Sequence, residues 1–427
     1  MYLSPAQSGF RCGRSCADIV WAHRWLVAKT LRYKALVHIL GIDMSQAFDT
    51  IDRAKLLDII RNIPNINNDD FRLIQFLLAN TTLQVQFNGI LTAPFTSNIG
   101  SPQGDGLSPI LFAIYLESAI QSLRSHGLVR PEADKLTGLP ESLVYADDTD
   151  FVSFVREYLD RLITVLGPLF REDFKLIVND DKTENTLVGH SDMGADQKAW
   201  RNTKKLGSLL GVEEDVTRRI QLANVSLNKL EKLWKHRTLV ALDVRLKAYR
   251  ALVESVLLYN SGTWALSSLL ADKIDRAQRK MLRRVLGVTW RDKITIENLY
   301  ARCNVVPASV QVVNARWRLF GHVLRMNENV PARQAMYCYF NEKSHKGRQG
   351  NFCTIASVLS DEYKSVCLKS IKTKADYEAV VELAQDREQW KGIVQNVTQK
   401  YCESRREKVI KQREVRKKAG AKREEKK

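Results

Sequence analysis

The chain has 427 residues, enough to bury a large core and to divide into roughly two to four domains. Its 66 Lys and Arg residues outnumber its 48 Asp and Glu residues, and the net charge of +18 points to a polyanionic partner such as nucleic acid. No apolar run approaches the roughly 18 residues that cross a bilayer, and the seven cysteines are scattered, so we expect neither a membrane span nor a disulfide framework.

The first predicted strand ends in a carboxylate. Residues 36–42 form an apolar run of strand length that ends at Asp43, and residues 54–60 then carry apolar side chains at helical spacing. Asp43 therefore stands where a buried strand leads into a helix. It could cap that helix, but Ser45 or Asp49 could do so equally, which would leave Asp43 free to face a cleft.

A glycine-rich turn opens the next predicted helix. Gly100, Gly104 and Gly106 permit a close approach of the backbone, and Ser108-Pro109 would cap and begin a helix with one buried face. Such a turn presents free N–H groups and the positive end of the helix dipole, which favours phosphate. Many helices follow similar turns, so the pattern becomes specific only between two carboxylate-bearing strands.

Two adjacent carboxylates, Asp147 and Asp148, separate two strand-like apolar runs in residues 141–155. One interpretation is a solvated hairpin turn, in which Asp bonds to the local backbone. In the other, the strand that ends at Asp43 lies beside this hairpin and the three carboxylates converge. Clustered carboxylates repel each other unless hard divalent cations neutralise them, so this second interpretation predicts a metal site.

The second half of the chain is predicted to be mostly helical. Residues 217–270 contain two amphipathic runs, and residues 272–291 form a further amphipathic helix. Its apolar face has five members: Ile274, Ala277, Met281, Leu282 and Val285. Its basic residues lie largely elsewhere: Arg276, Arg279, Lys280, Arg283 and Arg284. They could follow the phosphates of a nucleic-acid duplex, or they could simply face solvent.

The last hundred residues show charge but no specific chemistry. Residues 331–403 predict a helical extension, and residues 404–427 hold 12 Lys or Arg and four Glu with few apolar side chains. We expect this basic tail to be disordered or a solvated single helix. Its Lys and Arg clusters are a weak nuclear import signal, so the expected location is nuclear or cytoplasmic.

Three of these segments resemble, in order, the core motifs of reverse transcriptases, and the non-LTR (LINE-type) retrotransposon class fits best. The segments are GIDMSQAFDTI, GSPQGDGLSPILFAIYLE and LVYADDTDFVSF. Further segments resemble the fingers motif, the lysine-bearing palm motif, the primer-grip hairpin and a segment downstream of the thumb: AQSGFRCGRSCADIV, LIVNDDKTENTLVG, KKLGSLLGV and RWRLFGHVLRM. The resemblance covers about residues 5–330.

The resemblance implies an α+β fold, the right-hand polymerase palm of antiparallel strands backed by helices, with partial fingers and a helical thumb. The implied domains are partial fingers (1–35), palm (36–195) with a fingers insertion near 62–98, primer grip and thumb (196–330), helical extension (331–403) and basic tail (404–427). Because the match begins inside the fingers motif, we expect an N-terminally truncated fragment of a longer reading frame.

The implied activity is that of an RNA-directed DNA polymerase. The primer 3′-OH would attack the α-phosphorus of a dNTP on an RNA template with a DNA primer, using two Mg²⁺ ions, or Mn²⁺, as cofactors. Asp43, Asp147 and Asp148 would be the metal-binding triad, assisted by the main-chain carbonyl of Met44. Lys182 would be a general acid for the pyrophosphate leaving group, with a plain surface lysine as the alternative.

A nucleotide site is implied as well. Phe48, next to Ala47, would be the steric gate that clashes with a ribose 2′-OH, and a role as a core aromatic is compatible with that. Gln103 would contact the incoming nucleotide, and Gly104 would let the backbone approach the template.

Basic residues in two regions would contact nucleic acid. Arg11 and Arg14 would be fingers contacts to the template or the triphosphate. The helix at 272–291 follows the primer-grip segment, so its basic face would follow the primer–template duplex.

Two other functions compete with the polymerase. One is a catalytically impaired nucleic-acid-binding protein derived from a reverse transcriptase, which an incomplete fingers domain favours and an intact triad opposes. The other is an unrelated metal-dependent nuclease, which would explain the carboxylates but not the ordered Gly-rich helix and Phe48.

Overall fold

The computed structural model describes residues 2–79, 81–102, 104–236, 239–341 and 352–424. The chain forms two compact units, one of residues 1–200 with 327–345 and the other of residues 201–326 with 346–427. Among the described residues, none of the helices combines the length and the apolar character that crossing a bilayer requires.

A four-stranded antiparallel sheet forms the centre of the first unit. Its strand order is β10-β1-β8-β7. Strand β1 (Val37–Ile42) is the predicted apolar strand, and it is central because β8 (Asp148–Ser153) and β10 (Glu184–Val188) pair with its two edges. Strand β7 (Ser142–Tyr145) forms the predicted hairpin with β8. The pairing of β1 with this hairpin is the arrangement that the second interpretation of the acidic pair requires.

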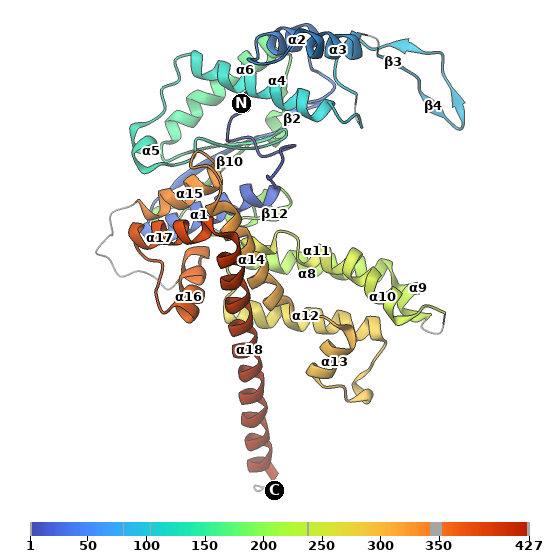
Figure 1. Ribbon diagram of the computed structural model, residues 1–427, viewed down its shortest axis with the longest axis vertical. Coiled ribbons are helices and arrows are strands. Elements are labelled where there is room, and N and C mark those ends of the chain that lie inside the picture. Colours follow the sequence, from blue (N-terminus) through green and yellow to red (C-terminus); the bar gives the residue numbers. More distant parts are fainter. Residues whose placement is uncertain (1, 80, 103, 237–238, 342–351, 425–427) are drawn as a thin grey trace. The chain divides into compact units, whose positions relative to one another are not determined.

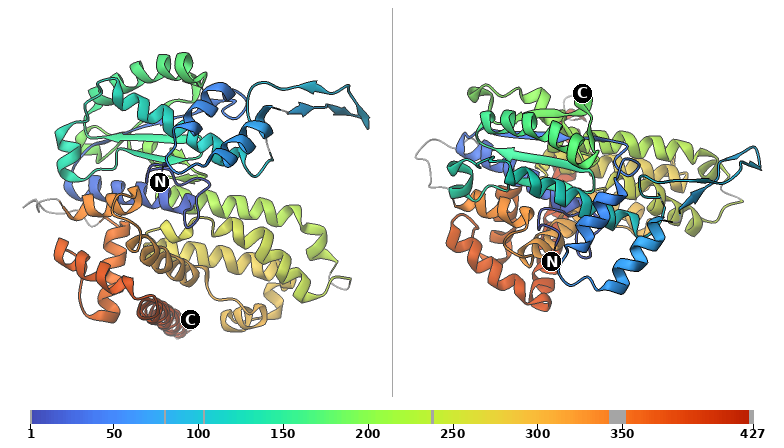
Figure 2. Two further views of the ribbon diagram at one scale, coloured as in Figure 1. Left: turned by 45° about the horizontal axis from the view of Figure 1, so that its top comes forward. Right: turned by 90° about the horizontal axis from the view of Figure 1, so that it is seen from above.

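Helices cover both faces of this sheet (Figure 2). Helices α2 (Arg53–Arg61), α4 (Ser108–Ser125) and α6 (Arg156–Phe174) share one apolar core with the strands. Helix α1 (Cys16–Tyr33) packs against β7 from the other side. An antiparallel sheet between helices confirms the predicted α+β class.

Helix α15 (Pro331–Phe340) belongs to the first unit and packs along α1. The Lys29 ammonium donates to the Cys338 carbonyl over 3.0 Å, and the Arg32 guanidinium donates to the Tyr339 hydroxyl over 2.7 Å. The rings of Trp25 and Tyr339 meet edge to face at 5.2 Å. Through these contacts the first helix of the expected helical extension over 331–403 belongs to the first unit.

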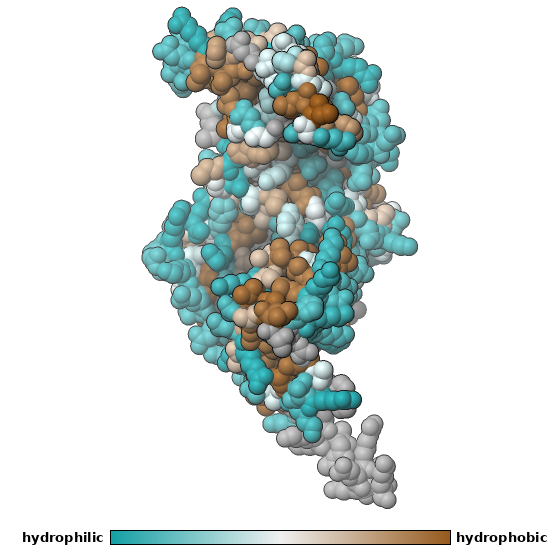
Figure 3. All heavy atoms as spheres, turned by 90° about the vertical axis from the view of Figure 1, so that its right-hand side faces the viewer, coloured by the Kyte–Doolittle hydropathy of each residue, from teal (hydrophilic) through white to brown (hydrophobic). Residues whose placement is uncertain are grey.

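The predicted fingers insertion is a helix followed by a long hairpin arm (Figure 1). Helix α3 (Asn68–Ala79) leads into the arm strands β3 (Thr82–Leu83), β4 (Gln86–Phe87), β5 (Ile90–Leu91) and β6 (Phe95–Thr96). Asn88 and Gly89 both have positive φ, as a tight two-residue hairpin turn requires. The arm exposes apolar side chains, which form the brown patch in the upper part of Figure 3.

Two helix starts differ from the expected ones. The cap of α2 is Asp52, whose Oδ1 accepts the N–H groups of Ala54 and Lys55 at 2.9 and 3.1 Å, so the cap is none of the three residues expected. Helix α4 already includes Ser108, whose hydroxyl donates to the Pro102 carbonyl at 2.6 Å. That hydroxyl therefore fastens the preceding turn and does not cap the helix. The first unit also contains the short elements β2 (Met44–Ser45), α5 (Glu132–Thr137) and β9 (Ile177–Val178), and it ends within α7 (Gln197–Asn202).

The second unit is helical, as the sequence predicts, apart from one small hairpin. The hairpin strands are β11 (Lys204–Lys205) and β12 (Ser208–Leu209). The helices up to the amphipathic one are α8 (Val212–Lys229), α9 (Glu231–Lys235), α10 (Leu242–Tyr249), a π-helical turn (Arg250–Glu254), α11 (Ser255–Leu257) and α12 (Ser268–Leu286). The later ones are α13 (Ile296–Cys303), α14 (Ala308–Leu324), α16 (Ile355–Cys367), α17 (Lys374–Gln385) and α18 (Arg387–Glu424).

Helix α14 contains all but the last two residues of the RWRLFGHVLRM segment and forms the centre of the C-terminal half of this unit. Arg316 is fully buried and forms an ion pair with Glu362 of α16, and the same carboxylate accepts the indole N–H of Trp317 at 2.7 Å. Gly321 lies directly against the Trp390 ring of α18. The segment is therefore a packing element that holds α16 and α18.

The described part of the basic tail is helical, because α18 continues to Glu424. The expectations for residues 404–427 are disorder or a solvated single helix, and the structure describes a helix over residues 404–424. Arg405 and Lys408, in the first turns of this tail, form ion pairs with Asp272 of α12, which is one physical reason for its helical structure.

Candidate active site

The sheet brings the predicted acidic residues to one end of a strand pair. Ile42 pairs with Thr149, so continuing the antiparallel register by one residue places Asp43 across from Asp148, the first residue of β8. Asp147 precedes it in the turn between β7 and β8. Asp43 and Asp147 are partly exposed and Asp148 is exposed, so all three carboxylates can reach solvent.

The turn that carries these carboxylates is held by a residue that the sequence reasoning missed. Ala146 has φ 57°, which is unusual for a residue with a side chain. The buried Gln7 amide brackets it: its Oε1 accepts the Ala146 N–H at 3.0 Å, and its Nε2 donates to the Ala146 carbonyl at 3.3 Å. A Cβ on Gly9 would lie 2.3 Å from the Ala146 nitrogen, so only glycine lets this segment approach the turn. Gly9, in the segment that resembles the fingers motif, was the sequence signal that could have indicated this close approach.

Lys182 lies beside the first carboxylate. A short 3₁₀ turn over Asp180–Lys182 presents its ammonium 3.2 Å from Oδ2 of Asp43. The backbone is fixed there too, since the Asn179 N–H donates to the Asp43 carbonyl at 2.9 Å. Met44 pairs with Val178 in the same small ladder. The structure thus brings together Asp43, Met44 and Lys182 from two segments about 140 positions apart.

The chemistry of these groups fits a divalent cation, although they are not gathered into a finished ligand set. Carboxylate oxygens at the end of a sheet are the donors that hard divalent ions prefer. The Lys182 ammonium shows that a positive charge is accommodated at Asp43. In the part of the chain that the structure describes, no three Asp, Glu, His or Cys side chains lie together as one metal-binding group.

The predicted nucleotide site lies on the next segment. Ala47 is buried, and the half-buried Phe48 ring packs on Phe112 with 4.6 Å between centroids, so the core role of Phe48 is real. The glycine-rich loop is fastened to this segment, because the Ser101 N–H donates to the Phe48 carbonyl at 2.9 Å. Gly104 has φ 93° and open space around its Cα, which suits a close approach of a ligand. The predicted contact Gln103 lies outside the described residues.

Arg53 is a second residue that the sequence reasoning missed. Its guanidinium is buried and donates to the carbonyls of Leu78, Ser97, Ile99 and Gly100 at 2.6, 2.6, 3.2 and 2.8 Å. Burial without a carboxylate partner lowers its pKa. Arg53 thus clamps the end of α3 and the entry to the glycine-rich loop onto the start of α2. An isolated Arg in a helix gives no sequence signal for this role.

The predicted basic residues of the fingers serve the fold of their own segment. Arg11 donates to the Ser4 and Gln7 carbonyls at 2.6 and 3.1 Å, so it braces the residues that hold the Ala146 turn. Burial, followed by the charge of Arg11, lowers the pKa of Arg14. These contacts add a positioning role to the predicted contact with template or triphosphate.

The predicted basic helix is α12, in the second unit, and its basic residues differ in availability. Arg276 and Lys280 are exposed, whereas Arg279, Arg283 and Arg284 are partly buried. Arg284 is already engaged by Asn228 and by Glu231, 3.5 Å away. The apolar face is buried as predicted, since Ile274, Met281, Leu282 and Val285 lie in the core and Ala277 at its edge.

Comparisons with known proteins bear on this site. The sequence profile described as "Reverse transcriptase (RNA-dependent DNA polymerase)" matches residues 1–214. The RNA-directed DNA polymerase from mobile element jockey of Drosophila funebris is 24% identical over 306 residues, which cover 66% of this chain and 32% of that protein. The chain therefore spans about a third of the length of this curated relative.

Among solved structures, telomerases are similar to the chain. The telomerase of Candida albicans in complex with a fragment of telomeric RNA shares 11% identity with a TM-score of 0.38, over 78% of this chain and 55% of that one. Apo telomerase of Candida tropicalis shares 12% identity with a TM-score of 0.39, over 78% and 56%.

Proposed function

Because the chain belongs to the reverse transcriptase family, as its core motifs predicted, we propose that it is the RNA-directed DNA polymerase of a non-LTR retrotransposon. Membership in this family implies an RNA template and divalent metal ions. The finer proposal is that the chain extends a DNA primer with dNTPs and that two Mg²⁺ ions, replaceable by Mn²⁺, serve the transfer.

The observation that supports this proposal most is the register of β1 on β8. It sets Asp43 across from Asp148, which follows Asp147 in the chain, at an end of the sheet where solvent has access. Asp43 and Asp147 would hold the ions, with Asp148 and the Met44 carbonyl assisting. The ions, when bound, supply charge neutralisation for the attacking and leaving oxygens.

The side chains of the protein have positioning roles in this reaction. Lys182, released from Asp43, would hand a proton to the pyrophosphate oxygen. Phe48, fixed by Phe112, would exclude a 2′-OH, and the open backbone at Gly104 would lie against the template. Nucleotidyl transfer is mainly positioning and charge neutralisation, so a nucleophilic side chain is not required.

Primer extension tests the proposal directly. The purified chain is given an RNA template, a labelled DNA primer, dNTPs and Mg²⁺ or Mn²⁺, beside a chain with Asp147→Asn and Asp148→Asn. We expect extension by the unaltered chain and a loss of at least about 100-fold in the double variant. Asp69→Asn removes the same kind of charge from an exposed position and is the control, with unchanged extension. Equal extension by the double variant and the control would overturn the site.

A second candidate is a nucleic-acid-binding protein without turnover. The observation that favours it is that the acidic side chains in the described ranges are not gathered into a group of three. Salt-sensitive duplex binding without extension in either metal would select this candidate over the polymerase.

A further inference from the structure

The basic face of α12 begins with two acidic residues. In an α-helix, residues three or four positions apart lie on one face. Asp272 is followed on that face by Arg276, Arg279 and Arg283, with Asp275 and Lys280 at its two flanks. Carboxylates at the start of a phosphate-binding face would repel a polyanion, so their role needs an explanation.

Those carboxylates hold the basic helix α18. Arg405 reaches Oδ1 of Asp272 at 2.7 Å and Oδ2 of Asp275 at 2.6 Å, and Lys408 reaches Oδ2 of Asp272 at 2.9 Å. Burial alone would raise the pKa of Asp272, yet the hydrogen bonds from Lys408 and Arg405 outweigh it and hold that pKa below its ordinary value. We call these four residues the α12–α18 staple. It neutralises both carboxylates and attaches the basic part of α18 to the end of the α12 face.

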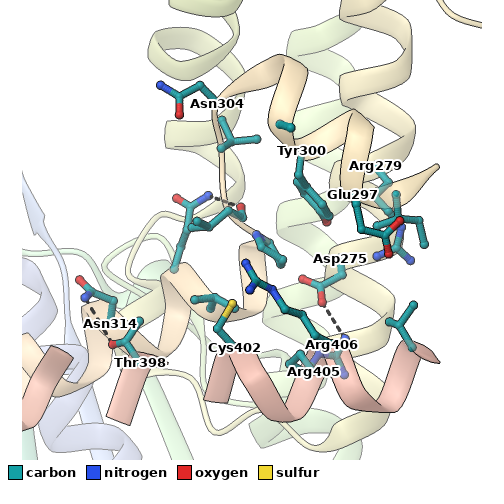
Figure 4. A pocket seen from close by; sticks show the side chains of 18 of the residues that line it. Asp275, Arg279, Glu297, Tyr300, Asn304, Asn314, Thr398, Cys402, Arg405 and Arg406 are labelled. Carbon is teal, nitrogen blue, oxygen red and sulfur yellow. Dashed lines mark hydrogen bonds and ion pairs between the residues drawn. The ribbon is translucent and has the colours of Figure 1, made fainter. Parts of the chain in front are cut away.

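A pocket of about 1030 Å³ lies beside the staple, between α12, α13, α14 and α18 (Figure 4). Arg279 contributes to it from α12 and Arg406 from α18. Of its three carboxylates, Asp275 is in the staple, Glu254 accepts from Gln278 and Gln311 at 3.1 and 3.0 Å, and Glu297 is exposed. Four arginines line the same walls: Arg250, Arg279, Arg405 and Arg406.

We propose that α12 and α18 form one composite surface for the phosphate backbone of nucleic acid, with the pocket between Arg279 and Arg406 as its centre. Arg276 and Lys280 extend it along α12, and the exposed Lys411 extends it along α18. The partner is identified by charge, because residues 404–427 add 12 Lys or Arg against four Glu. The inference rests on the proposed function for its partner, but not on catalysis.

Apolar docking explains the surface less well. Within residues 406–411, the exposed α18 residues that flank the staple are three charged ones, Arg406, Glu407 and Lys411, and one apolar one, Ile410. A backbone-binding surface without base contacts predicts affinity that depends on salt and hardly on sequence. A protein partner of acidic composition is the alternative outcome that the same experiment detects.

The staple allows a test in which charge and position predict opposite results. Asp272→Asn makes the chain more positive, so charge alone predicts tighter binding of a polyanion. It also removes the carboxylate that holds both Arg405 and Lys408, so the composite surface predicts weaker binding. Glu382→Gln, at an exposed position of α17, makes the same change of charge and is its control.

Arg406→Gln is the second variant, since Arg406 is exposed and its removal leaves the staple in place. Its control is Lys364→Gln, an exposed position of α16 with the same change of charge. Binding of the full chain to a fluorescent RNA–DNA primer–template is measured by anisotropy over a range of salt concentrations. Single-stranded RNA, duplex DNA and polyglutamate, as an acidic polypeptide, are measured beside it.

We expect Arg406→Gln to reduce the slope of log affinity against log salt by about 0.7–0.9, the value of one phosphate contact, while Lys364→Gln leaves it unchanged. We expect Asp272→Asn to bind several-fold more weakly than Glu382→Gln. Three outcomes would each overturn the inference. They are an equal salt slope for Arg406→Gln and Lys364→Gln, tighter nucleic-acid binding by Asp272→Asn than by Glu382→Gln, and a preference of the chain for polyglutamate over nucleic acid. Primer extension is measured on the same preparations to separate the proposed polymerase function from the proposed binding surface. A chain that shows the expected binding differences but does not extend the primer would contradict the polymerase function and leave the binding surface in place.

Discussion

The ammonium of Lys182 lies 3.2 Å from Oδ2 of Asp43, at the carboxyl end of strand β1. About two thirds of the Lys182 side chain (66%) and one third of the Asp43 side chain (32%) are exposed. An exposed ion pair of this kind is weak, so a divalent cation can displace the lysine. If Asp43 holds a metal ion as proposed, Lys182 and that ion would compete for one carboxylate oxygen, and the displaced lysine would be available as an acid.

This competition predicts an unusual pair of effects for Lys182→Gln. The Mg²⁺ concentration that gives half-maximal extension should fall, because the competing ammonium is gone, while the maximal rate should fall by about 100-fold, because the acid is gone. A Mg²⁺ titration of the extension rate measures both. Lys175→Gln, which removes an exposed lysine that donates to the main-chain carbonyl of Glu172, should change neither. A lower rate with an unchanged Mg²⁺ midpoint would contradict the competition.

The variant Phe48→Val tests whether the Phe48 ring selects the sugar of the nucleotide in addition to packing in the core. The smaller side chain should admit a ribose 2′-OH, so incorporation of ribonucleotides should rise relative to deoxynucleotides, at a stability cost of about 1–2 kcal/mol because the ring is only half buried. Single-nucleotide incorporation with rNTP and dNTP measures the selectivity. Phe112→Leu disturbs the same ring pair from its fully buried side and should cost stability without changing sugar selection. Equal loss of selectivity in both variants would assign Phe48 to packing alone.

Arg53→Lys tests the clamp on the glycine-rich loop. Lysine keeps the charge but cannot reach four carbonyls with a planar fork, so unfolding free energy should fall by about 1–3 kcal/mol. The entry to the loop would loosen, and the KM for dNTP should rise about tenfold with a smaller change in kcat. Arg61→Lys, on the same helix with its guanidinium over the Phe71 ring, should leave KM unchanged. An unchanged KM together with lost stability would reduce Arg53 to a purely structural residue.

The strands that carry the acidic residues could be predicted from the sequence, because they follow from local patterns, whereas the strand order β10-β1-β8-β7 could not, because it depends on pairing between distant segments. An apolar run ending at Asp43 and two runs around Asp147 specify strands, and antiparallel pairing brings their ends together. Arg53 and Gln7 could not be found in this way, since their partners are main-chain carbonyl and amide groups, which leave no trace in side-chain spacing. The docking of α15 on α1 joins residues more than 300 positions apart, and no local pattern records such contacts.

The glycine of the RWRLFGHVLRM segment is explained by the tryptophan it faces. A Cβ at Gly321 would lie 2.0 Å from Nε1 of Trp390, whose indole donates to the Trp317 carbonyl at 3.1 Å. Gly321→Ala should therefore lower the free energy of unfolding by about 1–3 kcal/mol through overpacking. Urea denaturation followed by circular dichroism measures it. Gly392→Ala, in a helix where nothing lies within 4 Å, should instead stabilise by up to about 1 kcal/mol, so equal effects at the two glycines would contradict this explanation.

The staple between α12 and α18 should open in acid, and the direction of the pKa shift fixes the range. The pKa of Asp272 is lower in the folded chain than its ordinary value of 3.8, because the hydrogen bonds from Lys408 and Arg405 outweigh burial. Folding is therefore favoured by the ionised carboxylate, and that contribution is fully present above pH 3.8 and is lost as pH falls through the folded pKa. Amide hydrogen exchange of residues 400–410 should show protection at pH 5. This protection should decrease below pH 3.8, before the rest of the second unit opens. In Asp272→Asn the same residues should exchange faster already at pH 5. Their exchange should also respond less to acid, because the titrating carboxylate has been removed while Arg405 and Lys408 keep their charge. Equal protection of the two chains at pH 5 would show that α18 is held by its apolar contacts alone.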